Sequence, residues 1–195
     1  MAGVRQFDEK RLLDQAVAVF RRKGLSGTSM LDLAEATGVQ RGSLYNAYRN
    51  KEQIFLLAFE RYAVSFTEAA SRALAAPDAR QALIAFFDVA IDNIASSGPS
   101  MGCLTTKVIT EAGAVGERVQ RRLRALLEEL EAAVRSTLER NGMEGQLTLE
   151  PAAAAQVVIT FTRGLAVMER VYRDRGQLRG AAAALVQALV SKNSQ

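Results

Sequence analysis

The segment from Gln40 to Asn46 gathers side chains that can hydrogen-bond to the edges of nucleic-acid bases. Gln, Asn and Arg side chains match the donor and acceptor patterns of base pairs in the major groove, and Ser can bind bases or phosphates. Leu44 and Tyr48 have the spacing of one buried helical face, so the polar side chains point elsewhere. The segment therefore predicts a short helix suited to the major groove of DNA, with a polar face formed by Gln40, Arg41, Ser43, Tyr45 and Asn46.

Gly42 lies in the middle of this predicted helix. Glycine at such a position costs about 1 kcal/mol relative to alanine. We therefore expect the backbone at Gly42 to approach another group closely, and a DNA phosphate is the natural candidate.

A second predicted helix precedes this one and would set its position. Ser29 is a favourable N-cap and Asp32 can complete a capping box, so this helix is predicted over residues 29–37. Gly38 can adopt the left-handed conformation that ends a helix, and Val39 supplies an apolar anchor in the turn. The pattern predicts a helix, a tight turn and a second helix.

A dense motif runs from Thr28 to Phe55: T-S-x-x-D-L-A-E-A-T-G-V-x-x-G-S-L-Y-x-x-Y-x-N-K-E-x-I-F. It resembles the DNA-binding domain of the TetR/AcrR family of one-component transcriptional regulators, over about 50 residues. The resemblance implies that Thr28 and Ser29 meet a phosphate and that Lys51 clamps the flanking DNA backbone. It also implies a reading surface formed by Gln40, Arg41, Gly42, Ser43, Tyr45 and Asn46.

Three further positions qualify this resemblance. Tyr48 matches an aromatic packing position of the family and is counted among the expected interface residues. The family often has His where this chain has Ala47, and Pro or Lys where it has Arg49. We therefore do not assign a phosphate contact to Ala47, and we expect Arg49 to replace it from nearby.

Composition limits the class of protein. The 195 residues are 49% hydrophobic, which suffices for a proper core. No apolar run approaches the roughly 20 residues that cross a bilayer, and the N-terminus lacks the apolar core of a signal peptide. One cysteine and no histidine exclude an intramolecular disulfide, most zinc sites and His-dependent triads. We expect a cytoplasmic protein that is not an enzyme and holds no metal or cofactor.

The net charge of +4 is concentrated near the N-terminus. Residues 1–55 contain nine Lys and Arg against six Asp and Glu, a difference of +3. Arg21, Arg22 and Lys23 end a predicted helix, where their main role would be to complement the helix dipole. Their position also suits attraction of phosphates.

The apolar periodicity is helical along the whole chain, and no strand pattern competes with it. The predicted fold is all-α with about nine helices, over residues 8–23, 29–37, 40–47, 52–75, 78–95, 103–112, 115–140, 151–174 and 178–191. Breaks are expected at residues 96–100 and 141–145. Residues 1–51 form the predicted helix-turn-helix domain, and residues 52–195 form the predicted effector-binding and dimerisation domain.

The last two predicted helices are rich in small residues, and the apolar residues of the first are too widely spread for one core contact. A second buried face is therefore expected. The resemblance implies that these helices pair with their copies across a two-fold axis. We expect a homodimer whose two N-terminal domains meet two half-sites of a pseudo-palindrome.

The resemblance also implies a ligand cavity among the fifth to eighth helices. The chain has no His, and only two basic residues, Lys107 and Arg163, are candidates near this region. An apolar or weakly polar ligand is therefore expected. Plain core packing is the alternative for each candidate lining residue. These candidates are Phe86, Phe87, Ile91, Cys103, Leu104, Val108, Leu127, Phe161 and Met168.

Cys103 leaves two interpretations open. It can be a small buried hydrophobic residue at the start of a helix. Alternatively it is a sensor thiol, because a helix N-terminus and a lysine one turn on, Lys107, both favour the thiolate. Some TetR-like proteins with a similar Gly-Cys-Leu segment sense electrophiles or oxidants in this way.

The leading hypothesis is a sequence-specific DNA-binding transcriptional regulator, a repressor released from its operator by a small-molecule or electrophile effector. Its expected partners are double-stranded operator DNA, the effector and a second copy of the chain, with no membrane. One alternative is an all-helical enzyme or carrier that retains the N-terminal helices as a structural unit. Another is an architectural DNA binder. An enzyme would need a reactive constellation, and Glu111, Arg163 and Glu169 are too scattered in sequence to suggest one.

Overall fold

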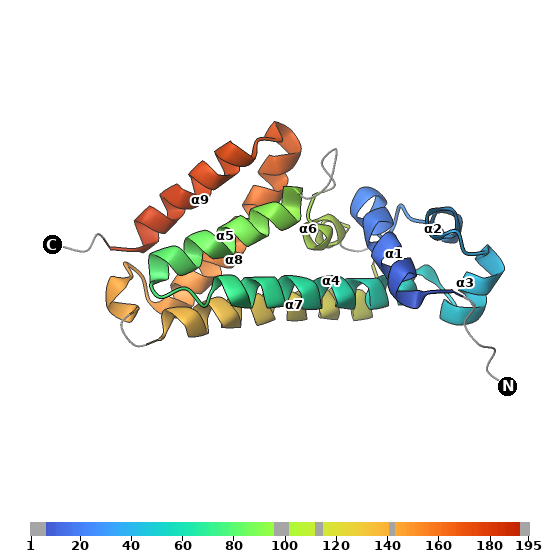
Figure 1. The fold of residues 1–195 in the computed structure, drawn as a ribbon, viewed down its shortest axis with the longest axis horizontal. Coiled ribbons are helices and arrows are strands. Elements are labelled where there is room, and N and C mark those ends of the chain that lie inside the picture. The colour runs from blue at the N-terminus through green and yellow to red at the C-terminus, as the bar shows by residue number, and fades with distance from the viewer. Residues whose placement is uncertain (1–6, 96–101, 112–114, 141–142, 192–195) are drawn as a thin grey trace. The chain divides into compact units, whose positions relative to one another are not determined.

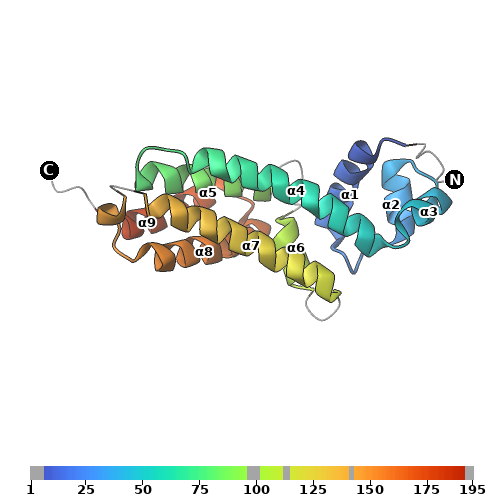
Figure 2. The same ribbon diagram turned by 90° about the horizontal axis from the view of Figure 1, so that it is seen from below.

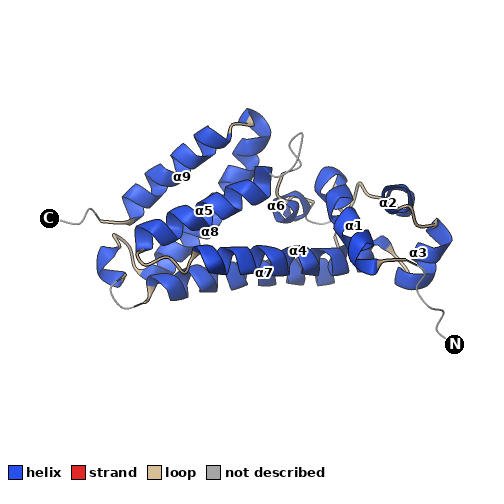
Figure 3. Cartoon of the chain, in the orientation of Figure 1, coloured by secondary structure: helices blue, strands red, loops and turns tan. Residues whose placement is uncertain are grey.

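A computed structural model describes residues 7–95, 102–111, 115–140 and 143–191. Within these ranges the chain is all-α, and its one β-type pairing is an isolated bridge between Leu147 and Val190 (Figure 3). The predicted fold class is confirmed. The helices are α1 (Glu9–Lys23), α2 (Met30–Thr37), α3 (Arg41–Tyr48), α4 (Lys51–Ala73), α5 (Ala79–Ala95), α6 (Leu104–Ile109), α7 (Glu117–Leu138), the 3-10 helix η1 (Glu144–Gln146), α8 (Pro151–Tyr172) and α9 (Arg175–Leu189).

Internal contacts divide the chain into two compact units. The first unit comprises Met1–Val64 and Leu104–Leu123, and the second comprises Ser65–Cys103 and Arg124–Gln195. Helices α4 and α7 each contribute residues to both units. The functional division after residue 51 stays a prediction.

In the first unit, α1, α2 and α3 pack together at the N-terminal end of the chain (Figures 1 and 2). An aromatic series joins α1 to the first half of α4. Phe20 meets Phe55 edge to face at 5.1 Å between ring centroids, and Phe55 stacks on Phe59 at 5.4 Å. Arg61 of α4 also binds Asp14 of α1, with Nη2 at 3.0 Å from Oδ1. These contacts fix the first half of α4 against α1.

The α2–α3 arrangement follows the sequence prediction closely. The Ser29 side chain accepts from the backbone of Asp32, whose carboxylate accepts in return from the Ser29 backbone, so the capping box is complete. Gly38 adopts the left-handed conformation at φ +68°. Met30 and Leu33 are buried, and α3 begins at Arg41.

The turn from α3 to α4 is unusually tight. Arg49 has φ +58° and ψ −49°, and the N–H of Asn50 donates to the carbonyl of Tyr48 at 2.5 Å. This is a γ-turn with positive φ, a strained conformation for a residue with a side chain. The Asn50 side chain then accepts from the N–H of Gln53 at 2.9 Å, so it caps α4. As a result α4 begins one residue earlier than predicted, at Lys51.

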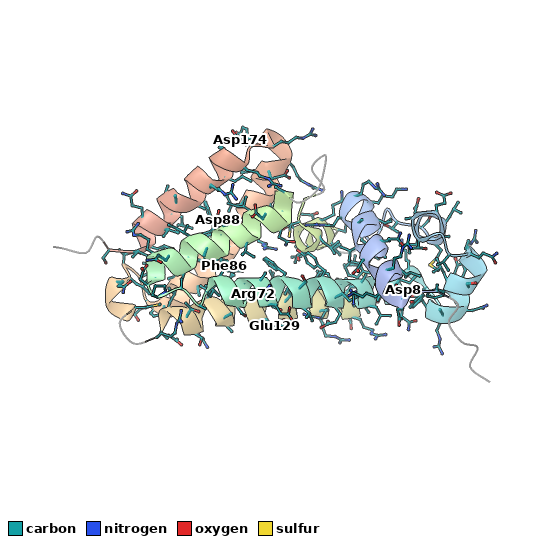
Figure 4. The ribbon with its side chains drawn as sticks, viewed as in Figure 1. Asp8, Arg72, Phe86, Asp88, Glu129 and Asp174 are labelled. Carbon is teal, nitrogen blue, oxygen red and sulfur yellow. The ribbon has the colours of Figure 1, made fainter. Side chains whose placement is uncertain are left out.

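In the second unit, α5 packs against both α8 and α9. Arg179 of α9 binds two aspartates of α5, with Nε at 2.7 Å from Asp88 Oδ1 and Nη2 at 3.2 Å from Asp92 Oδ1. Figure 4 labels Asp88 on α5 and Asp174 at the start of α9. The charge of the two aspartates raises the pKa of Arg179 above its ordinary value, mainly through the hydrogen bond to Asp88.

Several helix ends differ from the prediction, and at α9 the cause is a side-chain cap. Asp174 accepts from the N–H groups of Gly176 and Gln177, so α9 begins at Arg175 and not near residue 178. Helix α7 ends at Leu138, and the Arg140 guanidinium then binds the carbonyl of Leu74. Helix α6 ends at Ile109, short of the predicted end near residue 112, and residues 112–114 lie outside the described ranges. The predicted break at 96–100 lies outside them, as do the first two residues of the predicted break at 141–145, whose remainder leads into η1.

Helix α8 is long and apolar enough, by length and composition, to cross a membrane. It has 22 residues, and an 18-residue stretch has a mean hydropathy of 1.3. Because Arg163 interrupts the apolar residues of this helix, the sequence contains no uninterrupted apolar run of that length here. In this fold 39% of the stretch is buried, and α8 packs against α5 and α9. The core helix of a folded domain passes the same test.

Candidate nucleic-acid interface

Helix α3 separates a buried face from a polar exposed face. Leu44 and Tyr48 have none of their surface exposed. The recognition surface consists of Gln40, Arg41, Gly42, Ser43, Tyr45 and Asn46, and every one of these residues is exposed. The structure therefore leaves exposed all six residues that the resemblance assigned to the reading surface.

Within this surface, Arg41 and Tyr45 are neighbours across one helical turn. The Arg41 guanidinium carbon lies 5.6 Å from the centroid of the Tyr45 ring, a cation–π arrangement. The Tyr45 side chain, 42% exposed, thus orients an arginine that still presents hydrogen-bond donors to solvent. A planar guanidinium held in this way is suited to a guanine edge or a phosphate.

Gly42 faces open space. A Cβ built on Gly42 would meet no atom within 4 Å. The fold of the protein itself therefore does not require glycine at this position. The close approach of a DNA phosphate to Gly42 stays a prediction.

Two of the predicted interface residues are buried. Tyr48 packs inside the first unit, and its hydroxyl donates to Glu9 Oε1 at 3.1 Å. Thr28 is 2% exposed, and its hydroxyl donates to the carbonyl of Gly24. In this structure both side chains hold the helices in place, and a phosphate contact by Thr28 stays a prediction.

The N-terminus of α2 is occupied by an ion pair as well as a cap. Lys23 Nζ binds Asp32 Oδ1, and the N–H and hydroxyl of Ser29 both donate to Asp32 Oδ2. These contacts hold the pKa of Asp32 far below its ordinary range, with the Lys23 hydrogen bond as the largest cause. The two donors of the exposed Ser29 and the Lys23 ammonium are thus all bound to Asp32, and a phosphate contact by Ser29 stays a prediction.

Lys51, the first residue of α4, is partly buried. Its ammonium donates to the carbonyls of Ser26 at 3.1 Å and Thr28 at 2.8 Å. The ammonium has three donors, so two of them bind the chain's own backbone. Sequence reasoning assigned Lys51 to DNA alone and did not foresee that it holds the loop before α2.

The last two positions discussed from the sequence lie at the end of α3. Arg49 is exposed on the γ-turn, and Ala47 is partly exposed. The replacement of a contact at Ala47 by Arg49 stays a prediction.

The candidate ligand residues separate into several environments. Phe86, Phe87 and Phe161 form an edge-to-face series in the second unit, with centroids 5.9 Å apart in each pair. Cys103 is 4% exposed, and Arg163 Nη1 donates to its sulfur at 3.5 Å.

The remaining ligand candidates do not share that environment. Ile91 is buried and Leu127 partly buried in the second unit, whereas Leu104 and Val108 are buried residues of the first unit. Met168 is 45% exposed on α8. A common cavity for the nine candidates stays a prediction.

Two protein-family models match the chain. The model described as bacterial regulatory proteins of the tetR family matches residues 12–58, which include α2 and α3. The model described as the tetracyclin repressor-like C-terminal domain matches residues 79–185, more than half of the chain. The chain belongs to the TetR family. The predicted family and the general function of a DNA-binding transcriptional regulator are thereby confirmed.

Individual TetR-family relatives agree with this assignment. The HTH-type transcriptional repressor NemR of Escherichia coli K12 is 25% identical over 167 residues, which is 83% of each protein. The uncharacterised HTH-type regulator YezE of Bacillus subtilis is 36% identical over 77 residues, and this match spans 40% of either chain.

Solved TetR-family structures match nearly the whole fold. The reduced form of E. coli NemR has a TM-score of 0.83 at 21% identity and covers 96% of this chain and 98% of its own. A cysteine-substituted CifR, solved with 26-bp double-strand operator DNA, has a TM-score of 0.82 at 25% identity and covers 96% and 99%.

Proposed function

We propose that this chain is an operator-specific repressor that binds DNA through the recognition surface of α3. The exposed polar face of α3 carries the proposal, because it combines base-reading side chains with a glycine that the fold does not need. NemR is named a transcriptional repressor and CifR was solved on operator DNA, which supports the same role here.

The direct test is an electrophoretic mobility shift with promoter DNA that flanks the gene of this protein. The full-length chain should retard this DNA at concentrations where random DNA of equal length stays unbound. Absence of binding to any DNA would contradict the proposal.

We further propose that the regulator is a cytoplasmic homodimer assembled through α8 and α9. Val167, Met168, Val171 and Tyr172 are between 44% and 65% exposed along the end of α8, which is unusual for large apolar side chains in a monomer. Small residues on α9 would allow a second pair of helices to approach closely. A two-fold dimer would also place two copies of α3 for two half-sites.

Cys103 is the proposed point at which an electrophile or oxidant acts. The sulfur is buried, and the Arg163 guanidinium that donates to it would stabilise a thiolate. If this proposal holds, Cys103→Ser should retain operator binding and lose its release by reactive electrophiles such as N-ethylmaleimide. Release of the Ser variant to the same extent as the wild type would contradict the proposal and leave Cys103 as a core residue.

A further inference from the structure

The loop between α1 and α2, residues 24–28, leads directly to the N-cap Ser29 of α2. Two distant segments hold this loop. One is the start of α4, through Lys51, and the other is the segment after α6, through Glu111. Glu111 lies 85 residues from its partner in the loop and belongs to the same compact unit.

Both polar groups of the Ser26 backbone bind charged side chains. The N–H of Ser26 donates to Glu111 Oε2 at 2.9 Å, and the carbonyl of Ser26 accepts from Lys51 Nζ at 3.1 Å. Hydrogen bonds to charged groups are stronger than neutral ones. The carboxylate and the ammonium thus fix the orientation of the loop at Ser26 from two sides.

Gly24 provides a second, independent observation for Glu111. A Cβ on Gly24 would overlap the Glu111 carboxylate, so the loop makes room for this side chain. Gly24 also has φ +75°, which other residues rarely adopt. The glycine therefore serves both the end of α1 and the close approach of Glu111.

We propose that Glu111 is a positioning residue for DNA binding, although it lies far outside the helix-turn-helix segment in sequence. Its carboxylate fixes Ser26, which precedes the predicted phosphate contact at Ser29 by three residues. Helix α2 in turn packs against α3. Loss of the Glu111 carboxylate lets the loop and the N-terminus of α2 move. Ser29 and the recognition surface of α3 are then held less often in the relative position that DNA binding needs. This inference rests on the proposed operator binding.

The test compares operator binding by the full-length Glu111→Ala and Glu111→Gln variants with the wild type. The alanine variant should bind the operator at least about fivefold more weakly, since a hydrogen bond to a charged acceptor is lost. The glutamine variant keeps an acceptor oxygen for Ser26 and should regain most of the affinity. Glu117→Ala, which removes an exposed carboxylate from the start of α7, is the matched control and should bind like the wild type.

Two further measurements separate positioning from a general loss of folding. The amide resonance of Ser26 should shift in Glu111→Ala and stay near its wild-type position in Glu111→Gln. In the wild-type background, Gly24→Ala adds a Cβ that displaces the Glu111 carboxylate. In the Glu111→Ala background there is no carboxylate to displace, so the double variant should lose less operator affinity than the sum of the two single losses. If Glu111→Ala does not fold, Glu111→Asp, which is too short to reach Ser26, takes its place.

The outcomes distinguish this inference from the proposed function. Failure of the wild type to bind the operator contradicts the proposed function. Wild-type binding together with unchanged affinity in Glu111→Ala or Glu111→Asp overturns the role of Glu111 alone. Equal losses in the alanine and glutamine variants would also overturn it, because the acceptor oxygen would then be irrelevant.

Discussion

Individual residues of α3 differ in whether the protein's own fold needs them. Leu44 and Tyr48 are fully buried and hold the helix in place. Arg41 and Gly42 have no such role, because one is exposed over Tyr45 and the other faces open space. Substitutions at these two positions therefore test DNA binding without removing a contact that the fold needs.

Arg41→Ala should weaken operator binding by about 1 to 3 kcal/mol and relax the choice of sequence, because an arginine contact to a base edge carries discrimination. Lys51→Ala should instead weaken binding to random DNA as well as to the operator, because it removes a positive charge together with the contacts that hold the loop at Ser26 and Thr28. Fluorescence anisotropy with operator and random duplexes at fixed salt measures both effects. Arg121→Ala, on the exposed face of α7, is a control of equal charge change. Equal losses on both duplexes for Arg41→Ala would argue against a base contact.

Gly42→Ala should have opposite effects on stability and on binding. An added methyl group has free space, and alanine is the better helix former by about 1 kcal/mol, so the free energy of unfolding should rise. Operator affinity should fall if the DNA backbone approaches Gly42 as proposed. Urea denaturation and a binding titration on the same preparation provide both values. A stabilised variant with wild-type affinity would show that nothing approaches Gly42 closely.

At the scale of elements, the N-terminus of α2 is an electrostatic cap with a defined pH dependence. The pKa of Asp32 is lowered in the folded protein, first by Lys23 and then by Ser29. A carboxylate with a lowered pKa stabilises the fold fully above its unfolded pKa of about 3.9, and this stabilisation is lost as the pH falls through the folded pKa. The cap of α2 is therefore at full strength at neutral pH.

We expect Asp32→Asn to lower the free energy of unfolding at neutral pH and to converge with the wild type in acid. The difference in unfolding free energy between the two proteins should begin to shrink below about pH 4. Asp32 of the unfolded wild type is then protonated, whereas Asp32 of the folded protein stays ionised. Urea denaturation over a series of pH values measures the difference. In a Lys23→Met background the pH-dependent part should be smaller, since the largest cause of the shift is gone. A difference that does not change with pH would contradict this account.

At the scale of the whole molecule, the exposed apolar end of α8 is the surface that the proposed dimer would bury. Val171 is 65% exposed and Tyr172 is 56% exposed, whereas the side chains on the opposite face of α8 pack within the second unit. Burial of such residues against a second copy would stabilise a dimer through the hydrophobic effect.

If the proposed dimer forms, Val171→Glu should convert it to a monomer, because the interface would then bury an added charge from each copy. Light scattering coupled to size-exclusion chromatography measures the mass in solution. Val64→Glu changes another exposed valine, 46% exposed on α4, and should leave the mass unchanged. A wild type that is already a monomer would contradict the proposed interface.

Features that depend on local physics could be predicted from the amino-acid sequence. The capping box of Ser29 and Asp32, the left-handed Gly38, and the buried and polar faces of α3 follow from spacing and backbone preference over a few residues. The family motif lies in the same stretch, which is why the regulator family could be predicted, and helical periodicity along the whole chain predicted the all-α fold.

Features that depend on residues distant in sequence emerged only from the packing of the folded chain. The contact of Lys51 with the carbonyl of Thr28 and the contact of Glu111 with Ser26 join residues 23 and 85 positions apart. A hydrogen bond to a backbone N–H or carbonyl leaves no signature in the partner's residue type, so spacing could not reveal it. Local periodicity therefore specified which surface is suited to DNA, and long-range packing specified which residues hold that surface in place.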